Sequence, residues 1–305
     1  MNIGILDFDG SLTSQKRLLS KYSPKVIDLK SFSSSARLWM NKDTAGVIQG
    51  CIRELNGGIN FLGSGDFHHI SSLFTDLIDE PAALIIFDFH PDWDILPPSI
   101  GCGSWVTRSL KNKNIAKCIL IGVSSSDIQF PSIQSGNLKL LEDNRAEIYP
   151  YKSKPSSVFL KRVPPNKSIK LKRGVISTKI FWHELAKEDL SSFFLSLILS
   201  LPTKKAYISI DKDCLKDDYA LTNWESGFLS LDELLTMIKL IKDNLDIAGV
   251  DITGDYSKPT YRSFLKSIAS CLDHPSDIKA DSLQEERIRE LNEDTNLKLL
   301  SVLNP

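Results

Sequence analysis

The chain has 305 residues, with 37 Lys and Arg against 38 Asp and Glu and a formal net charge of −1 at pH 7. It lacks the basic excess of a general nucleic-acid-binding protein, so we expect no nucleic-acid partner. Five scattered cysteines form no Cys-x-x-Cys pair, which argues against a zinc ribbon or disulfide framework and favours the cytoplasm. The longest apolar run, 193–201, is too short to span a bilayer, and the first residues do not resemble a signal peptide, so we expect no membrane partner.

Apolar runs alternate with amphipathic patterns along the chain. The expected strands are 2–8, 59–63, 82–89, 116–123, 206–211 and 246–252, and the expected helices are 44–56, 187–201 and 230–244. Ser230 and Glu233 form the capping box that begins the last helix. Several strands are apolar on both faces, as in a parallel sheet with helices on both sides. The sequence therefore predicts a three-layer α/β/α fold with a mostly parallel sheet, in a single domain spanning 1–305.

The first expected strand ends in Asp7-Phe-Asp9-Gly, which resembles the Asp-x-Asp motif of haloacid-dehalogenase-type phosphatases. In that family the first Asp attacks phosphorus and the second is the general acid. The family also needs a later acidic magnesium motif, which "GDYS" at 254–257 matches poorly. The phosphatase interpretation stays an alternative. Otherwise we expect Asp7 and Asp9 at the rim of the site, where they either bind substrate or cap the following helix.

Residues 150–174 differ in composition from the rest of the chain. They contain eight Lys and Arg, four Pro and neither Asp nor Glu, so a long helix is not expected there. One interpretation is a solvated insertion loop. The other is a docking surface for an acidic partner or peptide.

Metal-binding types of side chain follow three of the expected strands. They are His68 and His69, then Asp88, His90, Asp92 and Asp94, and then Asp211 and Asp213. Alternate residues share a face if the extended backbone continues, and ligands bind at the carboxyl ends of parallel strands. Close carboxylates repel one another unless cations lie among them. The pattern therefore predicts a pair of metal ions.

This order of motifs resembles the arginase or ureohydrolase family, over roughly residues 59–255. The resemblance implies an arginase-like fold and a binuclear manganese site, two Mn²⁺ per chain, that hydrolyses guanidinium groups. The implied ligands are His68 and Asp92 for one metal, His90 and Asp213 for the other, and Asp88 and Asp211 as bridges. Asp92 would also steady the attacking hydroxide and pass its proton to the leaving amine. The choice of His68 over His69 stays open.

The chain also departs from that family. No His occurs between His90 and His183, so the shuttle His of small-molecule arginases is missing, and the glycine-rich substrate loop is reduced to "LTNWESGF" at 221–228. Asp251 matches the position of the Glu that grips the guanidinium. The substrate-binding residues that we expect are Asp251, Asp7, Asp9, Trp105 and Glu225.

This combination resembles peptide arginases, which convert arginine side chains of ribosomal peptides into ornithine with release of urea. We therefore expect an arginine-containing peptide or a small guanidino compound as the partner. The alternatives are a small-molecule ureohydrolase of the arginase or agmatinase type, a zinc deacetylase of the histone-deacetylase type, the phosphatase and a non-catalytic binder. A homo-oligomer is left open.

Overall fold

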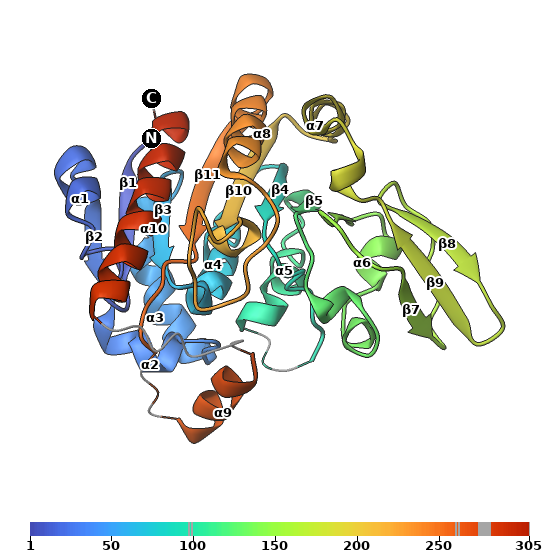
Figure 1. Ribbon diagram of the computed structural model, residues 1–305, viewed down its shortest axis with the longest axis horizontal. Helices are drawn as coiled ribbons and strands as arrows, with labels where there is room; N and C mark the ends of the chain where they lie inside the picture. The colour runs from blue at the N-terminus through green and yellow to red at the C-terminus, as the bar shows by residue number, and fades with distance from the viewer. Residues whose placement is uncertain (97, 99, 260, 262, 274–281, 305) are drawn as a thin grey trace.

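Eight parallel strands form the central sheet of the computed structural model, which describes residues 1–96, 98, 100–259, 261, 263–273 and 282–304. The strand order is β2-β1-β3-β11-β10-β4-β5-β6 (Figure 1). Every neighbouring pair runs parallel, so all carboxyl ends lie at one edge of the sheet. This edge is where an α/β sheet binds ligands.

The strands of this sheet are β1 (Ile3–Asp7), β2 (Lys25–Asp28), β3 (Ile59–Gly63), β4 (Ala82–Phe87), β5 (Ile115–Ile121), β6 (Ala146–Tyr149), β10 (Lys205–Asp211) and β11 (Asp246–Thr253). The α-helices are α1 (Lys16–Tyr22), α2 (Ser33–Ala36), α3 (Lys42–Ile52), α4 (Ser71–Thr75), α5 (Trp105–Ser109), α6 (Lys139–Glu142), α7 (Leu190–Leu199), α8 (Leu231–Asn244), α9 (Phe264–Asp273) and α10 (Ser282–Leu303). Among the described residues, no helix is long and apolar enough to cross a membrane.

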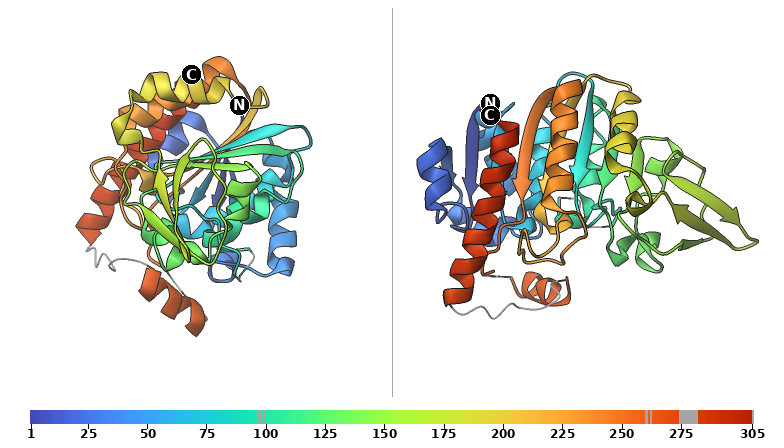
Figure 2. Two further views of the ribbon diagram at one scale, coloured as in Figure 1. Left: turned by 90° about the vertical axis from the view of Figure 1, so that its right-hand side faces the viewer. Right: turned by 45° about the horizontal axis from the view of Figure 1, so that its top comes forward.

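Two apolar cores sandwich the sheet, because successive side chains of a strand point to opposite faces. Leu84 and Ile86 of β4 belong to the core beneath α3, α4 and α5, whereas Ile85 and Phe87 belong to the core beneath α7, α8 and α10. All four side chains are fully buried, and each stabilises the fold by about 1.5–3 kcal/mol relative to exposure. Figures 1 and 2 show the helices on both faces, which confirms the predicted three-layer arrangement.

The expected elements recur with small differences at their ends. The capping box of α8 is present, with Ser230 Oγ accepting from Glu233 N and Glu233 Oε2 accepting from Ser230 N. The expected helix at 187–201 is shorter, because Asp189 is the N-cap of α7. Two strands of the central sheet were not predicted, β2 and β6, each of only four residues.

The basic segment is not a loop. Two of its stretches are strands, β7 (Ser156–Phe159) and β8 (Ile169–Arg173), and both pair antiparallel with β9 (Ser177–Trp182). We call residues 150–183 the basic arm. Its prolines at 150, 155, 164 and 165 lie outside the strands, where they remove no ladder hydrogen bond. The arm projects beyond the β6 edge of the central sheet (Figure 1).

Candidate metal centre

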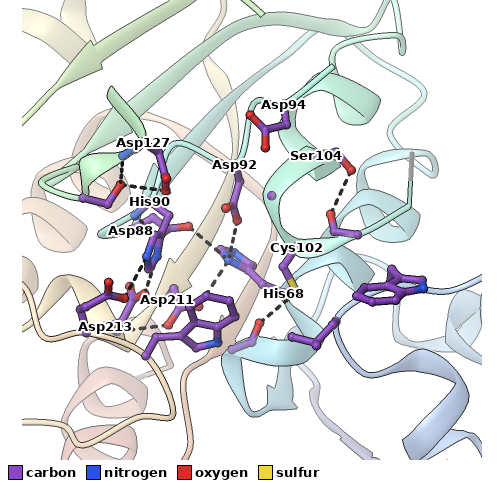
Figure 3. A pocket seen from close by; sticks show the side chains of 18 of the residues that line it. His68, Asp88, His90, Asp92, Asp94, Cys102, Ser104, Asp127, Asp211 and Asp213 are labelled. Atoms are coloured by element: carbon purple, nitrogen blue, oxygen red, sulfur yellow. Dashed lines mark hydrogen bonds and ion pairs between the residues drawn. The ribbon is translucent and has the colours of Figure 1, made fainter. Parts of the chain in front are cut away.

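A cavity of about 390 Å³ opens at the carboxyl ends of β4 and β10. Its lining includes seven carboxyl groups, those of Asp88, Asp92, Asp94, Asp127, Asp211, Asp213 and Glu225. Neither Lys nor Arg occurs among the described residues that line it. Figure 3 shows most of these side chains converging with His68 and His90. The cavity is therefore strongly anionic and suits cations.

Short local hydrogen bonds fix the carboxylates that follow β4 and β10. Asp88 Oδ1 accepts from His90 N at 2.7 Å, and Asp211 Oδ1 accepts from Asp213 N at 3.1 Å. Asp213 Oδ1 accepts from Phe89 N at 3.1 Å, which ties the two neighbouring strand ends together. Each carboxylate keeps its other oxygen for the cavity side of the site.

His68, and not His69, faces the carboxylates. His68 Nδ1 lies 3.2 Å from an oxygen of Asp88, 3.5 Å from one of Asp92 and 3.4 Å from one of Asp211. His69 does not line the cavity; its Nδ1 lies 3.5 Å from Cys102 Sγ, and burial lowers the pKa of His69 to about 3. Of the two neighbouring histidines, His68 is therefore the one that lies among the carboxylates.

His90 occupies the opposite side of Asp88. Its Nδ1 lies 3.0 Å from an oxygen of Asp213 and 3.7 Å from Asp88 Oδ1, and its Nε2 lies 3.2 Å from Glu225. Glu225 therefore lines the cavity, and its role in substrate binding stays a prediction. The side chain of Trp224 lies edge-on to His90, with ring centroids 5.3 Å apart.

Two groups of ligand atoms suit metal ions. The atoms of His68, Asp88 and Asp92 lie within 4.8 Å of one another, and so do those of Asp88, His90 and Asp213. Asp88 belongs to both groups, and its buried Oδ2 accepts no well-formed hydrogen bond from the described residues. Carboxylate oxygen and imidazole nitrogen suit a cation such as Mn²⁺. The residues present therefore fit two metal ions.

The pKa values of these side chains without metal ions also indicate a site for cations. Burial and neighbouring carboxylates raise the pKa of Asp92 and of Asp211 well above the ordinary range. Burial raises the pKa of Asp213 to about 6. Burial alone would lower the pKa of His68, but Asp88 and its neighbours raise it to about 10. Without metal ions, these side chains therefore hold protons, whose positive charge offsets the repulsion between the carboxylates that cations would otherwise offset.

Asp92 reaches the site through an unusual backbone. The extended conformation does not continue to this residue, contrary to the sequence prediction, because Asp92 has a φ of 46° in the left-handed region. Trp105 Nε1 donates to Asp92 Oδ2 at 2.7 Å, and the Trp105 ring lies 4.7 Å from that of His68. Trp105 is fully buried and does not line the cavity, so its prediction as a substrate contact is wrong. It contacts the side chains of both Asp92 and His68 and holds them in place.

Asp251 was predicted to grip the guanidinium, and the structure contradicts this. The side chain is fully buried and absent from the cavity lining. Its oxygens accept hydrogen bonds from Ser71 at 2.9 Å, Tyr207 at 2.8 Å and Ser209 at 2.6 Å. Ser209 Oγ also lies 2.9 Å from His68 Nε2. Asp251 therefore supports His68 from behind.

Asp7 and Asp9 also lie outside the cavity lining. Asp7 accepts from Gly10 N at 2.8 Å, and Asp9 accepts from Ser11 Oγ at 2.6 Å. The N-cap of α1 is Gln15, so neither aspartate caps that helix. The helix-cap prediction for this pair is therefore wrong, and the two carboxylates close the turn after β1.

Two further acidic residues line the cavity: Asp94, which the sequence singled out without giving it a role, and Asp127, which sequence reasoning missed. Asp94 bonds to Ser135 Oγ at 2.8 Å, and Asp127 lies in a short 3₁₀ helix, η5 (Ser126–Ile128), after β5. Burial, and to a lesser degree the charge of Asp127, raises the pKa of Asp94. Asp127 is the last residue of "IGVSSSD" (121–127), and its place shortly after the end of β5 was a usable signal. His183 is not in the cavity lining, and His274 lies outside the described residues.

No family model matches the chain. An uncharacterized protein of Thermotoga maritima is 26% identical over 254 residues, which are 83% of this chain and 80% of that protein.

Solved structures align over nearly the whole chain. A formimidoylglutamase of Bacillus subtilis covers 99% of this chain and 86% of its own, with a TM-score of 0.59 and 12% identity. An arginase of Bacillus subtilis covers 99% and 97%, with a TM-score of 0.56 and 12% identity. The proclavaminate amidino hydrolase of Streptomyces clavuligerus covers 96% and 91%, with a TM-score of 0.53 and 13% identity. The chain therefore has the fold of the arginase-type ureohydrolases.

Proposed function

We propose that this protein is a binuclear-metal hydrolase of the ureohydrolase superfamily, and that it converts arginine side chains of a peptide into ornithine with release of urea. The observation that carries this proposal is the pair of ligand groups that share Asp88 inside an anionic cavity. The names of the structural neighbours, which include arginase and amidino hydrolase, support a reaction at amidino carbon–nitrogen bonds.

The ligands that we assign are His68, Asp88 and Asp92 on one side and His90 and Asp213 on the other, with Asp211 beside His68. Two Mn²⁺ ions bound there would lower the pKa of water, so that a strong nucleophile is available at neutral pH. Guanidinium is resonance-stabilised and always protonated, so unassisted water attacks it poorly.

The chain's own residues orient the substrate and move a proton. The reaction consumes one water and breaks the bond between the guanidinium carbon and the side-chain nitrogen, which leaves as an amine. Asp92 lines the cavity, and we assign to it the transfer of a proton to that nitrogen. Asp251 has no part in gripping the substrate. Glu225, at the cavity wall beside His90, takes that place.

The negative charge of the cavity favours, as substrate, an arginine whose own α-carboxylate is absent or blocked. Two divalent cations would balance the carboxylates of Asp88, Asp92, Asp211 and Asp213. The other lining carboxylates, Asp94, Asp127 and Glu225, then face the substrate. They attract a guanidinium and repel a free α-carboxylate. A peptide-linked arginine avoids that repulsion, whereas free arginine does not.

A small guanidino amine satisfies the same charge argument, because the acidic rim would bind its second cationic group. Two solved neighbours are named as an agmatinase and an agmatine ureohydrolase. A deacetylase with one metal explains only one of the two ligand groups. A phosphatase centred on Asp7 is disfavoured, because that carboxylate bonds to Gly10 N and Thr13 Oγ1 within the turn.

The test supplies the manganese-loaded protein with an arginine-containing peptide, agmatine or free arginine. Urea release and a mass loss of CH₂N₂ from the peptide are measured for each. We expect the peptide to be the best substrate and free arginine the poorest. Equal turnover of free arginine and peptide would refute the peptide assignment, and urea release from none of them would refute the reaction.

A further inference from the structure

The basic arm carries an excess of exposed positive charge. It contains nine Lys and Arg residues, at 152, 154, 161, 162, 167, 170, 172, 173 and 179, and neither Asp nor Glu. All nine are exposed, and none forms an ion pair with another described residue. Since the whole chain is close to neutral, this charge is a local feature of the arm.

Like charges are placed opposite one another on the outer face of the arm. Lys172 of β8 is paired with Lys179 of β9, and Lys170 is paired with Phe181, whose side chain is 40% exposed. Cross-strand neighbours share a face, and like charges directly opposite destabilise a sheet. The arm therefore maintains a repulsion that an acidic partner would relieve.

Large apolar side chains are exposed where β7 and the β8–β9 turn meet. Leu160 is 89% exposed, Val175 fully exposed and Ile176 63% exposed, and Leu160 N donates to Ile176 O at 3.1 Å. Apolar groups beside a charged surface are typical of binding sites for macromolecules. A single small ligand would not need such a surface.

The root of the arm lies against the wall of the metal cavity. Gln129 Nε2 donates to Lys154 O at 3.0 Å, and Ser156 Oγ bonds to Ile128 O. Ile128 and Gln129 directly follow Asp127, which lines the cavity. A chain that leaves the cavity over Asp127 therefore meets the basic arm.

We propose that the outer face of the basic arm binds an acidic segment of the peptide whose arginine enters the cavity. This inference rests on the proposed function for the identity of the peptide. The six residues of β9 extend over ~20 Å, which an acidic segment of about six extended residues would cover. Lys170, Lys172 and Lys179 are the central contacts, with Phe181 opposite Lys170.

The test compares two triple variants with the same loss of charge. Lys170→Gln, Lys172→Gln and Lys179→Gln are combined in the arm variant. The control variant combines Lys111→Gln, Lys239→Gln and Lys298→Gln, all exposed and outside the arm. The probe is a labelled peptide with six consecutive Glu and without Arg, and a six-Gln peptide serves as the probe control. Binding to the manganese-loaded protein is followed by fluorescence anisotropy.

We expect the Glu peptide to bind the wild type and the control variant with the same affinity. We expect it to bind the arm variant roughly 3- to 150-fold more weakly, because three exposed ionic contacts are lost. The salt dependence of binding should also become shallower in the arm variant. Equal binding by the arm variant, or equal binding of the Gln peptide, would overturn the inference. So would tighter binding of a DNA duplex or of phosphatidylserine vesicles than of the Glu peptide.

A second peptide, with Glu residues and one Arg, separates the two proposals. The arm variant should raise KM for urea release and leave kcat unchanged, because the lost contacts act equally on ground and transition states. Binding of the Glu peptide without any urea release would refute the reaction and leave the docking surface standing. Urea release with an unchanged KM would refute the docking surface alone.

Discussion

Replacing Asp251 by Asn should weaken metal binding and leave substrate binding intact. The carboxylate accepts three hydrogen bonds from buried hydroxyls, and one of these hydroxyls, that of Ser209, also bonds to His68 Nε2. The other nitrogen of His68 faces Asp88 and Asp92. The substitution keeps the size of the side chain but removes its charge and replaces one acceptor by a donor.

The expected magnitude follows from these contacts. A hydrogen bond to a charged group contributes about 1.5–3 kcal/mol, and the Asn amide cannot accept all three. Loss of the bond from Ser209, the hydroxyl that contacts His68, corresponds to roughly a 10- to 100-fold weaker metal affinity, the range found when residues that support a metal ligand are changed. Excess Mn²⁺ should therefore restore much of the activity.

The assay is a Mn²⁺ titration of the metal-free protein, followed by kcat and KM for peptide at saturating metal. Asp218→Asn is the matched control, because that carboxylate is exposed and lies on the loop after β10. If Asp251→Asn binds Mn²⁺ as the wild type does but loses turnover, Asp251 contacts substrate and our account of its position is wrong. Ser209→Ala should give the same phenotype, and the two changes should not be additive.

Three further predictions concern other parts of the chain. Asp211→Asn should lose at least one metal ion and nearly all turnover, and a variant with two ions and full activity would show that the site is misplaced. His183→Ala should keep near-normal turnover, because this imidazole bonds to Glu188 at 2.7 Å outside the cavity; a collapse with metal content intact would contradict this. Burial lowers the pKa of Lys266 to about 8, whereas in the unfolded chain it stays at about 10.4. Between these values the unfolded state binds more protons, so stability relative to Lys266→Met should rise with pH. Urea unfolding at pH 7.5 and 9.5 tests this, and a fall would refute it.

The elements that positioned the site were predictable because their patterns are local. β4 is continuously apolar and is followed by Asp88, β10 is mostly apolar and ends at Asp211, and α8 begins with its own capping box. The two missed strands of the central sheet lack such signals. β2 is largely exposed, and β6 is short and contains a buried Glu147 that pairs with Lys117. Only the assembled sheet shows that this charge pair is internal.

Residues that support the site could not be distinguished from residues that line it. Asp251 lies one strand away from Asp211 and looks like another acid near a strand end, but its side chain points behind His68 and not into the cavity. The same holds for Trp105, which follows a long loop and packs under Asp92. The direction of a side chain depends on the register of neighbouring strands, which a single sequence does not give.

The basic arm was ambiguous for a related reason. Lys170 and Lys172 alternate with Ile169 and Leu171, a two-residue period that indicates a strand with one exposed face. The surrounding prolines and lysines concealed that short signal. The strand also depends on pairing with Ile180 and its neighbours in β9, which lie beyond the segment set apart by its composition.

The central claim is a binuclear site that hydrolyses a guanidinium, and one measurement tests it most directly. The metal-free protein is titrated with Mn²⁺ while bound metal and urea release from an arginine-containing peptide are followed in the same samples. The account predicts that activity is absent without metal and reaches its maximum at two Mn²⁺ per chain. Saturation at one metal ion, or full urea release from the metal-free protein, would contradict it.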